Sequence, residues 1–272
     1  MKPSTLPAYY TPFDKLGWYG LRVLCGAVLL FLLTPILVII PLSFSDSSFL
    51  SYPIPGWSLR WYHELFASEE WARATRNSFI VAPLATVLAT TLGTLAAVGL
   101  ARVQFFGKGL LTGLLIAPMV VPIVVVGVSA YLFFAQIGLS DSYTGLILVH
   151  AALGAPFVLT TVLATLQNFN QNLVKASLSL GAGQVETFFR ITLPVIAPGV
   201  ISGALFAFAT SFDEVVVTLF LAGPSQTTLP RQMFTGIREN ISPTIAAVAT
   251  LLILFTACLM MTLEWLRGRI KK

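Results

Sequence analysis

Residues 168–198 read NFNQNLVKASLSLGAGQVETFFRITLPVIAP, and this segment decides how the rest of the chain is organised. It is rich in small and polar residues, whereas long apolar runs of the kind that cross membranes lie on both sides of it. We therefore expect it to lie outside the lipid and to contact another molecule there. A plain long loop between two spans is the alternative.

Small residues and prolines define the local features of this segment. Gly181 can adopt the positive φ that a helix-ending turn needs, and Ala176 and Ser177 permit the close approach of another backbone. Pro194 and Pro198 suit the first turn of the next helix, where a missing N–H costs little.

The composition is that of an integral membrane protein. Hydrophobic residues make up 56% of the 272 residues and charged residues only 10%, against about a quarter in soluble domains. The formal net charge is +5, but the basic residues cluster beside apolar runs, which indicates topology determinants and no nucleic-acid partner. Cys25 and Cys258 both fall inside apolar stretches, so neither a disulfide framework nor a zinc site is predicted.

The apolar runs predict an all-α membrane protein with six transmembrane helices in one domain, residues 1–272, that lies in the lipid bilayer. We expect a tail over residues 1–22, a first span that is retained and not cleaved as a signal peptide, and a polar loop over residues 168–194. The spans are expected at about 23–42, 79–101, 110–136, 145–166, 196–221 and 244–263.

Charge asymmetry orients these spans. With the N-terminal tail in the cytoplasm, eleven of the sixteen Lys and Arg residues fall on the inner side and five on the outer side. The sequence therefore predicts a multi-pass protein of the bacterial inner membrane, with both termini and the loop 168–194 in the cytoplasm.

Between the first two spans, Trp61, Leu65 and Phe66 have helical spacing. They predict a short helix at the membrane interface, where aromatic rings prefer to lie. This helix is either a solvated connector or part of a surface that receives an external partner.

The fifth span reads VISGALFAFATSFDEVVVTLFLAGP over residues 200–224 and contains two acids. In a continuous helix Asp213 and Glu214 would lie near the middle of the hydrocarbon, where each acid costs roughly 2.5–3.5 kcal/mol. A cationic group that passes through a watered cavity would justify this cost, with Asp213 facing the pathway and Glu214 on a helix contact, or the reverse. The alternative is an ion pair or a protonated acid bonded to Ser211, Thr218 or a partner helix.

Other candidate residues have two interpretations each. His150 in the fourth span is either a proton relay or a packed, hydrogen-bonded residue. Tyr131 and Phe134 in the third span either line the outer part of a pathway, where aromatic faces attract amines, or belong to the core.

The polar segment resembles the cytoplasmic loop of ABC importer permeases. That motif is roughly Glu-Ala-Ala, three residues, Gly, nine residues, Ile-x-Leu-Pro, and Lys175 stands here where the family usually has Glu. The resemblance implies the type I permease fold, with two short helices that dock on an ATPase. It assigns this docking role to Lys175, Ala176, Ser177, Leu180, Gly181, Glu186, Ile191, Leu193 and Pro194.

A second resemblance concerns the substrate. Residues 211–217, then Gly223-Pro224-Ser225 and Leu229-Pro230, are similar to the second permease of spermidine/putrescine-type importers. Relatives with this stretch also take other cationic amines, amino acids or opine-like compounds. The resemblance implies two copies of an ATPase that bind ATP and Mg, a second homologous permease, and a periplasmic or lipid-anchored binding protein. No cofactor is expected on this chain.

Two other functions are weighed against a permease. The chain has no Gly-x-x-x-x-Gly-Lys-Ser/Thr loop. We therefore expect that it is not an enzyme and that another subunit hydrolyses ATP. An ion-coupled carrier would also use intramembrane acids, but it would usually show two inverted halves. An intramembrane hydrolase is disfavoured because residues 199–203, GVISG, miss the Gly-x-Ser-Gly spacing by one residue, and no His-Glu-x-x-His motif occurs.

Overall fold

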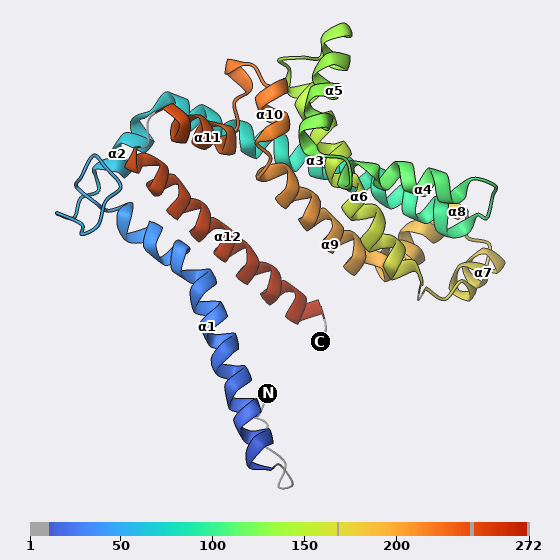
Figure 1. Ribbon diagram of the computed structural model, residues 1–272. Helices are drawn as coiled ribbons and strands as arrows, with labels where there is room; N and C mark the ends of the chain where they lie inside the picture. Colours follow the sequence, from blue (N-terminus) through green and yellow to red (C-terminus); the bar gives the residue numbers. More distant parts are fainter. Residues whose placement is uncertain (1–10, 168, 240–241, 271–272) are drawn as a thin grey trace. The chain divides into compact units, whose positions relative to one another are not determined.

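The structure is a computed structural model that describes residues 11–167, 169–239 and 242–270. Within these ranges the chain is helical, and its one extended pairing is an isolated bridge between Ser45 and Trp57. The all-α prediction is confirmed. The helices are α1 (Pro12–Leu42), α2 (Arg60–Ala67), α3 (Glu69–Arg102), α4 (Lys108–Ile116), η1 (Ala117–Met119), α5 (Ile123–Gln136), α6 (Tyr143–Gln167), α7 (Asn172–Ser179), α8 (Gln184–Thr187), η2 (Phe188–Thr192), α9 (Leu193–Phe212), α10 (Val216–Leu221), η3 (Pro224–Gln226), α11 (Leu229–Glu239) and α12 (Pro243–Ile270) (Figure 1).

The chain divides into two compact units. One contains the residues up to Ala67 together with those from Gly236 onward, and the other is Ser68–Thr235. In the first unit α1 packs against α12, and α12 also contacts α2. The loop motif and the acids of the fifth span both belong to the second unit.

In the first unit, α1 starts before the predicted span because a capping box begins it. Thr11 Oγ1 accepts a hydrogen bond from the backbone N–H of Asp14 at 3.3 Å, and the Asp14 carboxylate accepts one from the N–H of Thr11 at 2.9 Å. Residues 12–22, predicted as tail, are therefore helical and continue into the span. Residues 1–10 of that tail lie outside the described part of the chain.

The short helix predicted around Trp61 is present as α2, and its place at the membrane interface stays a prediction. Trp61 and Leu65 are buried, and Trp61 Nε1 donates to the carbonyl of Ser45 at 2.8 Å. Glu64 accepts a hydrogen bond from Thr244 Oγ1 at 3.2 Å, which connects α2 to the start of α12. Phe66 lies on the exposed face.

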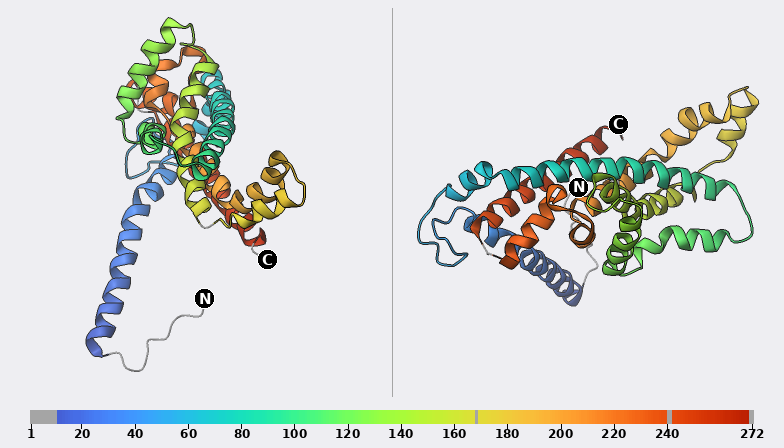
Figure 2. Two further views of the ribbon diagram at one scale, coloured as in Figure 1. Left: turned by 90° about the vertical axis from the view of Figure 1, so that its right-hand side faces the viewer. Right: turned by 90° about the horizontal axis from the view of Figure 1, so that it is seen from above.

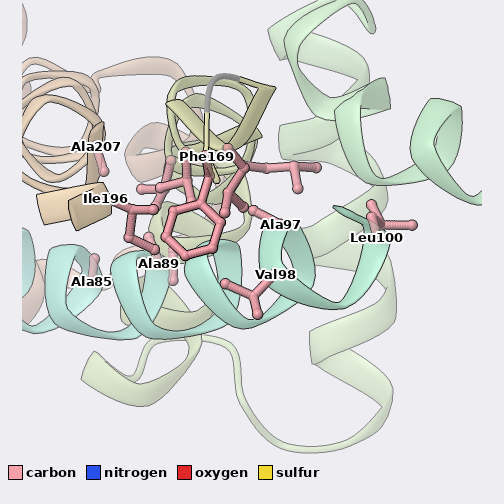
Figure 3. Close-up of a cluster of buried hydrophobic side chains, with 13 residues drawn as sticks. Ala85, Ala89, Ala97, Val98, Leu100, Phe169, Ile196 and Ala207 are labelled. Atoms are coloured by element: carbon pink, nitrogen blue, oxygen red, sulfur yellow. The ribbon is translucent and has the colours of Figure 1, made fainter. Parts of the chain in front are cut away.

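The core of the second unit is the bundle of α3, α6 and α9, which pack against one another (Figures 1 and 3). Small residues allow these helices to come close. A Cβ added at Gly93 would lie 2.7 Å from the Cβ of Val158, and one at Gly203 would lie 2.7 Å from the Cα of Val158. Ala85, Ala89 and Ala97 of α3 and Ala207 of α9 lie in the same buried cluster (Figure 3).

The third predicted span, 110–136, is not one straight helix. It consists of Lys108–Met119 and Ile123–Gln136, which meet at an angle of 99° (Figure 1). Pro122 stands at the break; proline lacks a backbone N–H and disfavours helical backbone in the residue before it.

The fifth predicted span, 196–221, is also broken. α9 ends at Phe212 and α10 begins at Val216, so Asp213 and Glu214 lie in the break. The estimate of their depth from a continuous helical rise therefore does not apply. α10 packs against α5, where a Cβ at Gly127 would come within 2.7 Å of the Phe220 ring.

The six predicted spans all fall on apolar helices or bent pairs of helices. Four helices, Phe13–Leu42, Glu69–Arg102, Tyr143–Gln167 and Gln184–Phe212, are long and apolar enough to cross a membrane. The bent pair α4–α5 would add a fifth crossing, and the apolar part of α12, Pro243–Cys258, is shorter. The chain is a multi-pass membrane protein.

Candidate functional site

The polar segment forms two short helices joined by a turn at Gly181. α7 ends at Ser179, and Gly181 has a φ of +88°, in the left-handed region that favours glycine. The N–H of Gly181 bonds to the carbonyl of Leu178 at 3.0 Å, and that of Ala182 bonds to the carbonyl of Ser177 at 3.2 Å. This pair of bonds is a Schellman motif, and the positive φ predicted for Gly181 is confirmed.

Contacts inside the segment hold the two short helices together. Ser177 Oγ lies 2.9 Å from Thr187 Oγ1, and Thr187 is buried. Glu186 pairs with Arg190 one turn later at 3.1 Å, on the exposed side. Ser177 therefore packs within the segment, and exposed Ala176 is left to face outward.

The segment also presents apolar side chains to the outside. Leu180 is 89% exposed, Val185 71% and Phe189 60%. Figure 2 shows α7 and α8 projecting from one end of the α3–α6–α9 bundle. Exposed apolar side chains gathered on a projection are typical of a surface that binds a partner. Val185 and Phe189 were missed from the sequence, although apolar residues inside a polar loop were a visible signal.

The remaining residues of the motif connect the segment to the bundle. Leu193 packs against the buried cluster of α3, α6 and α9, as do Val174 and Phe188. Ile191 is half-buried in the π-helical turn η2, and Pro194 lies in the first turn of α9 as predicted. The placement of Pro198 in a first turn is wrong, because α9 already begins at Leu193. Exposed Lys175 lies on α7. Asn168, where the predicted loop begins, is outside the described residues.

The two acids of the fifth span have different surroundings. Glu214 is half-buried, and its Oε1 accepts a hydrogen bond from the N–H of Val217 at 2.8 Å, so it caps the start of α10. Asp213 ends α9 with its side chain exposed. The predicted assignment, Asp213 to a pathway and Glu214 to a helix contact, is compatible with this geometry, and the pathway role stays a prediction.

A group of aromatic rings precedes Asp213. Phe208 stacks on Phe212 with ring centroids 5.4 Å apart, and Phe79 of α3 meets Phe212 edge-on at 5.5 Å. Aromatic faces attract cations, so a ring cluster that directly precedes an exposed carboxylate in the chain favours an organic cation there. These rings were not predicted, because the contact of Phe79 with Phe212 depends on the packing of α3 against α9.

The two aromatic residues predicted for the outer pathway differ in burial. Phe134 is buried in a cluster with Leu146, Val217 and Leu221, so it has the position of a core aromatic. Tyr131 is exposed and stays a candidate.

His150 is packed and hydrogen-bonded, as one of its two interpretations predicted. It is 1% exposed. Its Nδ1 lies 2.8 Å from Ser211 Oγ and its Nε2 lies 3.2 Å from Thr218 Oγ1. These partners stand on the two sides of the break in the fifth span.

A second set of buried polar contacts fixes the loop after α10. Asn77 of α3 donates to the carbonyls of Ser225 and Thr227 at 2.9 and 2.8 Å, and it accepts a bond from the Tyr143 hydroxyl at 2.7 Å. This arrangement gives Ser225 of the motif a structural role.

Arg231 supports the same loop, since it donates to the carbonyl of Ala222. Burial lowers the pKa of the Arg231 guanidinium from its usual value, and Asp141 opposes this shift.

A cavity of about 330 Å³ lies away from Asp213. It is lined by residues near the other end of α6 and by parts of α3 and α4, namely Leu100, Ala101, Lys108, Thr112, Leu163, Leu166 and Gln167. Asp213, which is exposed, is not among the residues that line this cavity.

Comparisons with known proteins agree with this geometry. Residues 89–272 match the family model of the binding-protein-dependent transport system inner membrane component. The chain is 34% identical to the spermidine/putrescine transport system permease protein PotC of Haemophilus influenzae, over 84% of this chain and 89% of that protein. It is also 34% identical to the putrescine transport system permease protein PotI of Escherichia coli K12, over 89% and 88%.

Solved structures are similar in fold. A bacterial ABC transporter involved in the import of the acidic polysaccharide alginate matches with a TM-score of 0.75 and 14% identity, over 96% of this chain and 98% of that chain. A second alginate transporter structure, in complex with a periplasmic protein that holds an alginate pentasaccharide, matches with a TM-score of 0.66 and 19% identity, over 92% and 93%. The chain belongs to the family of inner membrane components of binding-protein-dependent transport systems.

Proposed function

We propose that this permease imports a polyamine or a related cationic amine, and that Asp213 contacts the amine during its passage. The observation that carries the proposal is the exposed carboxylate of Asp213 at a helix break, directly after Phe212, whose ring stacks on that of Phe208. A carboxylate pairs with an ammonium group, and aromatic faces favour the same charge. The names of the spermidine/putrescine and putrescine permeases among the relatives support this substrate class.

The assembly that we propose contains two copies of an ATPase, a second homologous permease and a binding protein. ATP and Mg bind to the ATPase subunits, and this chain carries no cofactor. The exposed position of Asp213 in the single chain supports a second permease, whose surface would complete a substrate cavity around this residue. A binding protein would deliver the amine at the outer side.

In this mechanism the segment 172–192 transmits the movement of the ATPases. Leu180, Val185 and Phe189 enter a cleft on an ATPase, and the Schellman turn keeps α7 and α8 in a fixed relation. When the two ATPases close on ATP, the segment moves with them. Leu193, packed on the bundle, passes this movement to the spans, which change from inward-facing to outward-facing.

The topology belongs to the same proposal: six crossings, both termini in the cytoplasm, and the loop 168–194 on the inner side of a bacterial inner membrane. An ion-coupled carrier remains the second candidate, because broken helices with intramembrane acids, as at Asp213, are typical of carriers. Dependence of uptake on ATP, with no response to ion gradients, separates the two functions.

The experiment is uptake of labelled putrescine and spermidine by the complete transporter in vesicles. Asp213→Asn should lower uptake by roughly ten- to a hundredfold, the range expected for one lost charged hydrogen bond. Complex assembly and basal ATP hydrolysis should be unchanged. Asp46→Asn removes an exposed acid from the loop before α2 and should transport normally. Normal uptake by Asp213→Asn would remove Asp213 from the site.

A further inference from the structure

The buried side chain of His150 reaches both sides of the break in the fifth span. Ser211 is in the last turn of α9, and Thr218 is in the first turn of α10. Both residues are buried, at 5% and 0% exposure, and both of their hydroxyl groups bond to the imidazole ring of His150. Asp213 and Glu214 lie between these two residues in the chain.

On the α9 side, close helix packing sets the distance from His150 to Ser211. One turn further along α6, a Cβ at Gly154 would lie 2.9 Å from the Cβ of Ala207. Because α6 and α9 come this close, the short side chain of Ser211 reaches Nδ1.

On the α10 side, Thr218 Oγ1 also bonds to the carbonyl of Glu214, at 3.2 Å. Whichever ring nitrogen carries the proton, the imidazole bonds to Ser211 through Nδ1 and to Thr218 through Nε2. The chain of bonds runs from Ser211 through His150 and Thr218 to the backbone of Glu214.

The break needs such support because the sequence of residues 211–218 does not itself force the helix to end there. Residues 211–218 contain neither Gly nor Pro, and in lipid a continuous helix satisfies its backbone groups best. Without the imidazole, the Ser211 and Thr218 hydroxyls can bond to carbonyls of their own helix, as Ser and Thr do in apolar helices. Residues 213–215 would then be free to become helical and to link α9 with α10. Each residue that joins the helix changes the direction of the next side chain by about 100°.

We infer that His150 is a positioning residue: it holds α9 and α10 apart at the break and thereby keeps the side chain of Asp213 exposed. His150 itself is buried and does not touch the amine. The consequence for transport rests on the proposed function, whereas the effect on the exposure of residue 213 does not.

The test measures the accessibility of position 213 directly. Cys25 and Cys258 are replaced by Ala, since both are exposed, and Asp213→Cys is introduced into the assembled transporter. The probe is 2-aminoethyl methanethiosulfonate, a small cationic thiol reagent. His150→Leu, which has a similar volume and no hydrogen-bonding group, should lower the labelling rate at position 213 roughly tenfold, because two buried hydrogen bonds are lost.

Two further variants keep the test decisive if His150→Leu misfolds. Ser211→Ala and Thr218→Val each remove one bond to the imidazole ring and should lower the labelling rate roughly threefold. Thr94→Val is the matched control, because the Thr94 hydroxyl is buried and has no partner among the described residues. If His150→Leu does not assemble, the comparison of Thr218→Val with Thr94→Val decides.

Uptake measured in the background with native Asp213 gives the second readout. His150→Leu should reduce uptake, and adding Thr218→Val should reduce it little further, since the bond between His150 and Thr218 is already lost. An unchanged labelling rate at position 213 in His150→Leu and Thr218→Val would overturn the inference. Normal uptake by Asp213→Asn would instead reject the proposed function and leave the labelling result to decide the role of His150.

Discussion

The carboxylate of Glu214 accepts a hydrogen bond of 2.8 Å from the backbone N–H of Val217, and this contact distinguishes it from the neighbouring Asp213. Glu214 is used to begin α10, whereas the side chain of Asp213 stays exposed at the end of α9. Two adjacent acids in an apolar span therefore have separate tasks, one structural and one proposed to concern the substrate.

A capping role for Glu214 predicts that charge matters less than the acceptor oxygen. Glu214→Gln keeps an oxygen that can accept from Val217, and it should retain most of the uptake. Glu214→Ala removes the cap, at a cost of about 1 kcal/mol, and should lower the midpoint of thermal unfolding by roughly 2–4 °C. The measurement is thermal unfolding of the purified complex together with uptake. Loss of uptake in Glu214→Gln at unchanged stability would assign Glu214 to the pathway instead.

The left-handed conformation of Gly181 predicts that a β-branched residue there uncouples the transporter. Gly181→Val should strain the turn, since φ is +88°, and should abolish stimulation of ATP hydrolysis by the loaded binding protein. Gly181→Asn should keep much of the stimulation, because asparagine tolerates this region. Gly183→Val places the same side chain where φ is −71° and nothing lies within 4 Å, and it should preserve the turn. Full stimulation in Gly181→Val would contradict a docking role for this turn.

Lys175 stands where the family usually has an acid, so the contact with the ATPase should have the reverse charge. We expect an acidic residue of the ATPase to face it. Lys175→Glu should then weaken stimulation of ATP hydrolysis by roughly two- to fivefold at low salt, the scale of an exposed pair. Raising the salt concentration should shrink the difference, since exposed charges are screened. Lys175→Gln should be intermediate, and an effect of Lys175→Glu that persists at high salt would refute a charge contact.

The hydrogen bonds of Asn77 predict that its substitution lowers stability, although Asn77 has no proposed contact with the substrate. It is fully buried and makes bonds to Ser225, Thr227 and Tyr143. Asn77→Leu should cost about 1–3 kcal/mol, because it leaves buried carbonyls without donors, and it should expose residues 222–230 to limited proteolysis. Thr228→Val is the control in the same loop, since the Thr228 hydroxyl is buried without a partner among the described residues. Equal stability of both variants would show that these bonds do not hold the loop.

Much of the fold could be predicted because its signals are local. Long apolar runs predict the spans, and Gly181 predicts a helix-ending turn with positive φ, while the two short helices follow from the resemblance to the ABC permease loop. For His150 the sequence left two interpretations open, and the structure shows the packed, hydrogen-bonded one.

The breaks in the third and fifth spans could not be predicted in the same way. Pro122 gave a visible signal for the first, but prolines also occur inside intact helices of this chain, such as Pro83 in α3 and Pro156 in α6. The second break has no local signal, because it depends on contacts with His150, which is 61 residues away from Ser211 in the chain. Tertiary contacts, and not residue propensity, decide that α9 ends at Phe212.

The most direct test of the account is photo-crosslinking from position 180, whose side chain is 89% exposed on the projecting turn. A benzophenone amino acid is placed there in the complete transporter, and again at position 57 as the control, where the tryptophan is 72% exposed in the loop before α2. The probe at position 180 should form its adduct with the ATPase, and the probe at position 57 should not. An adduct from position 180 with the binding protein or with lipid, and none with the ATPase, would contradict the proposed docking.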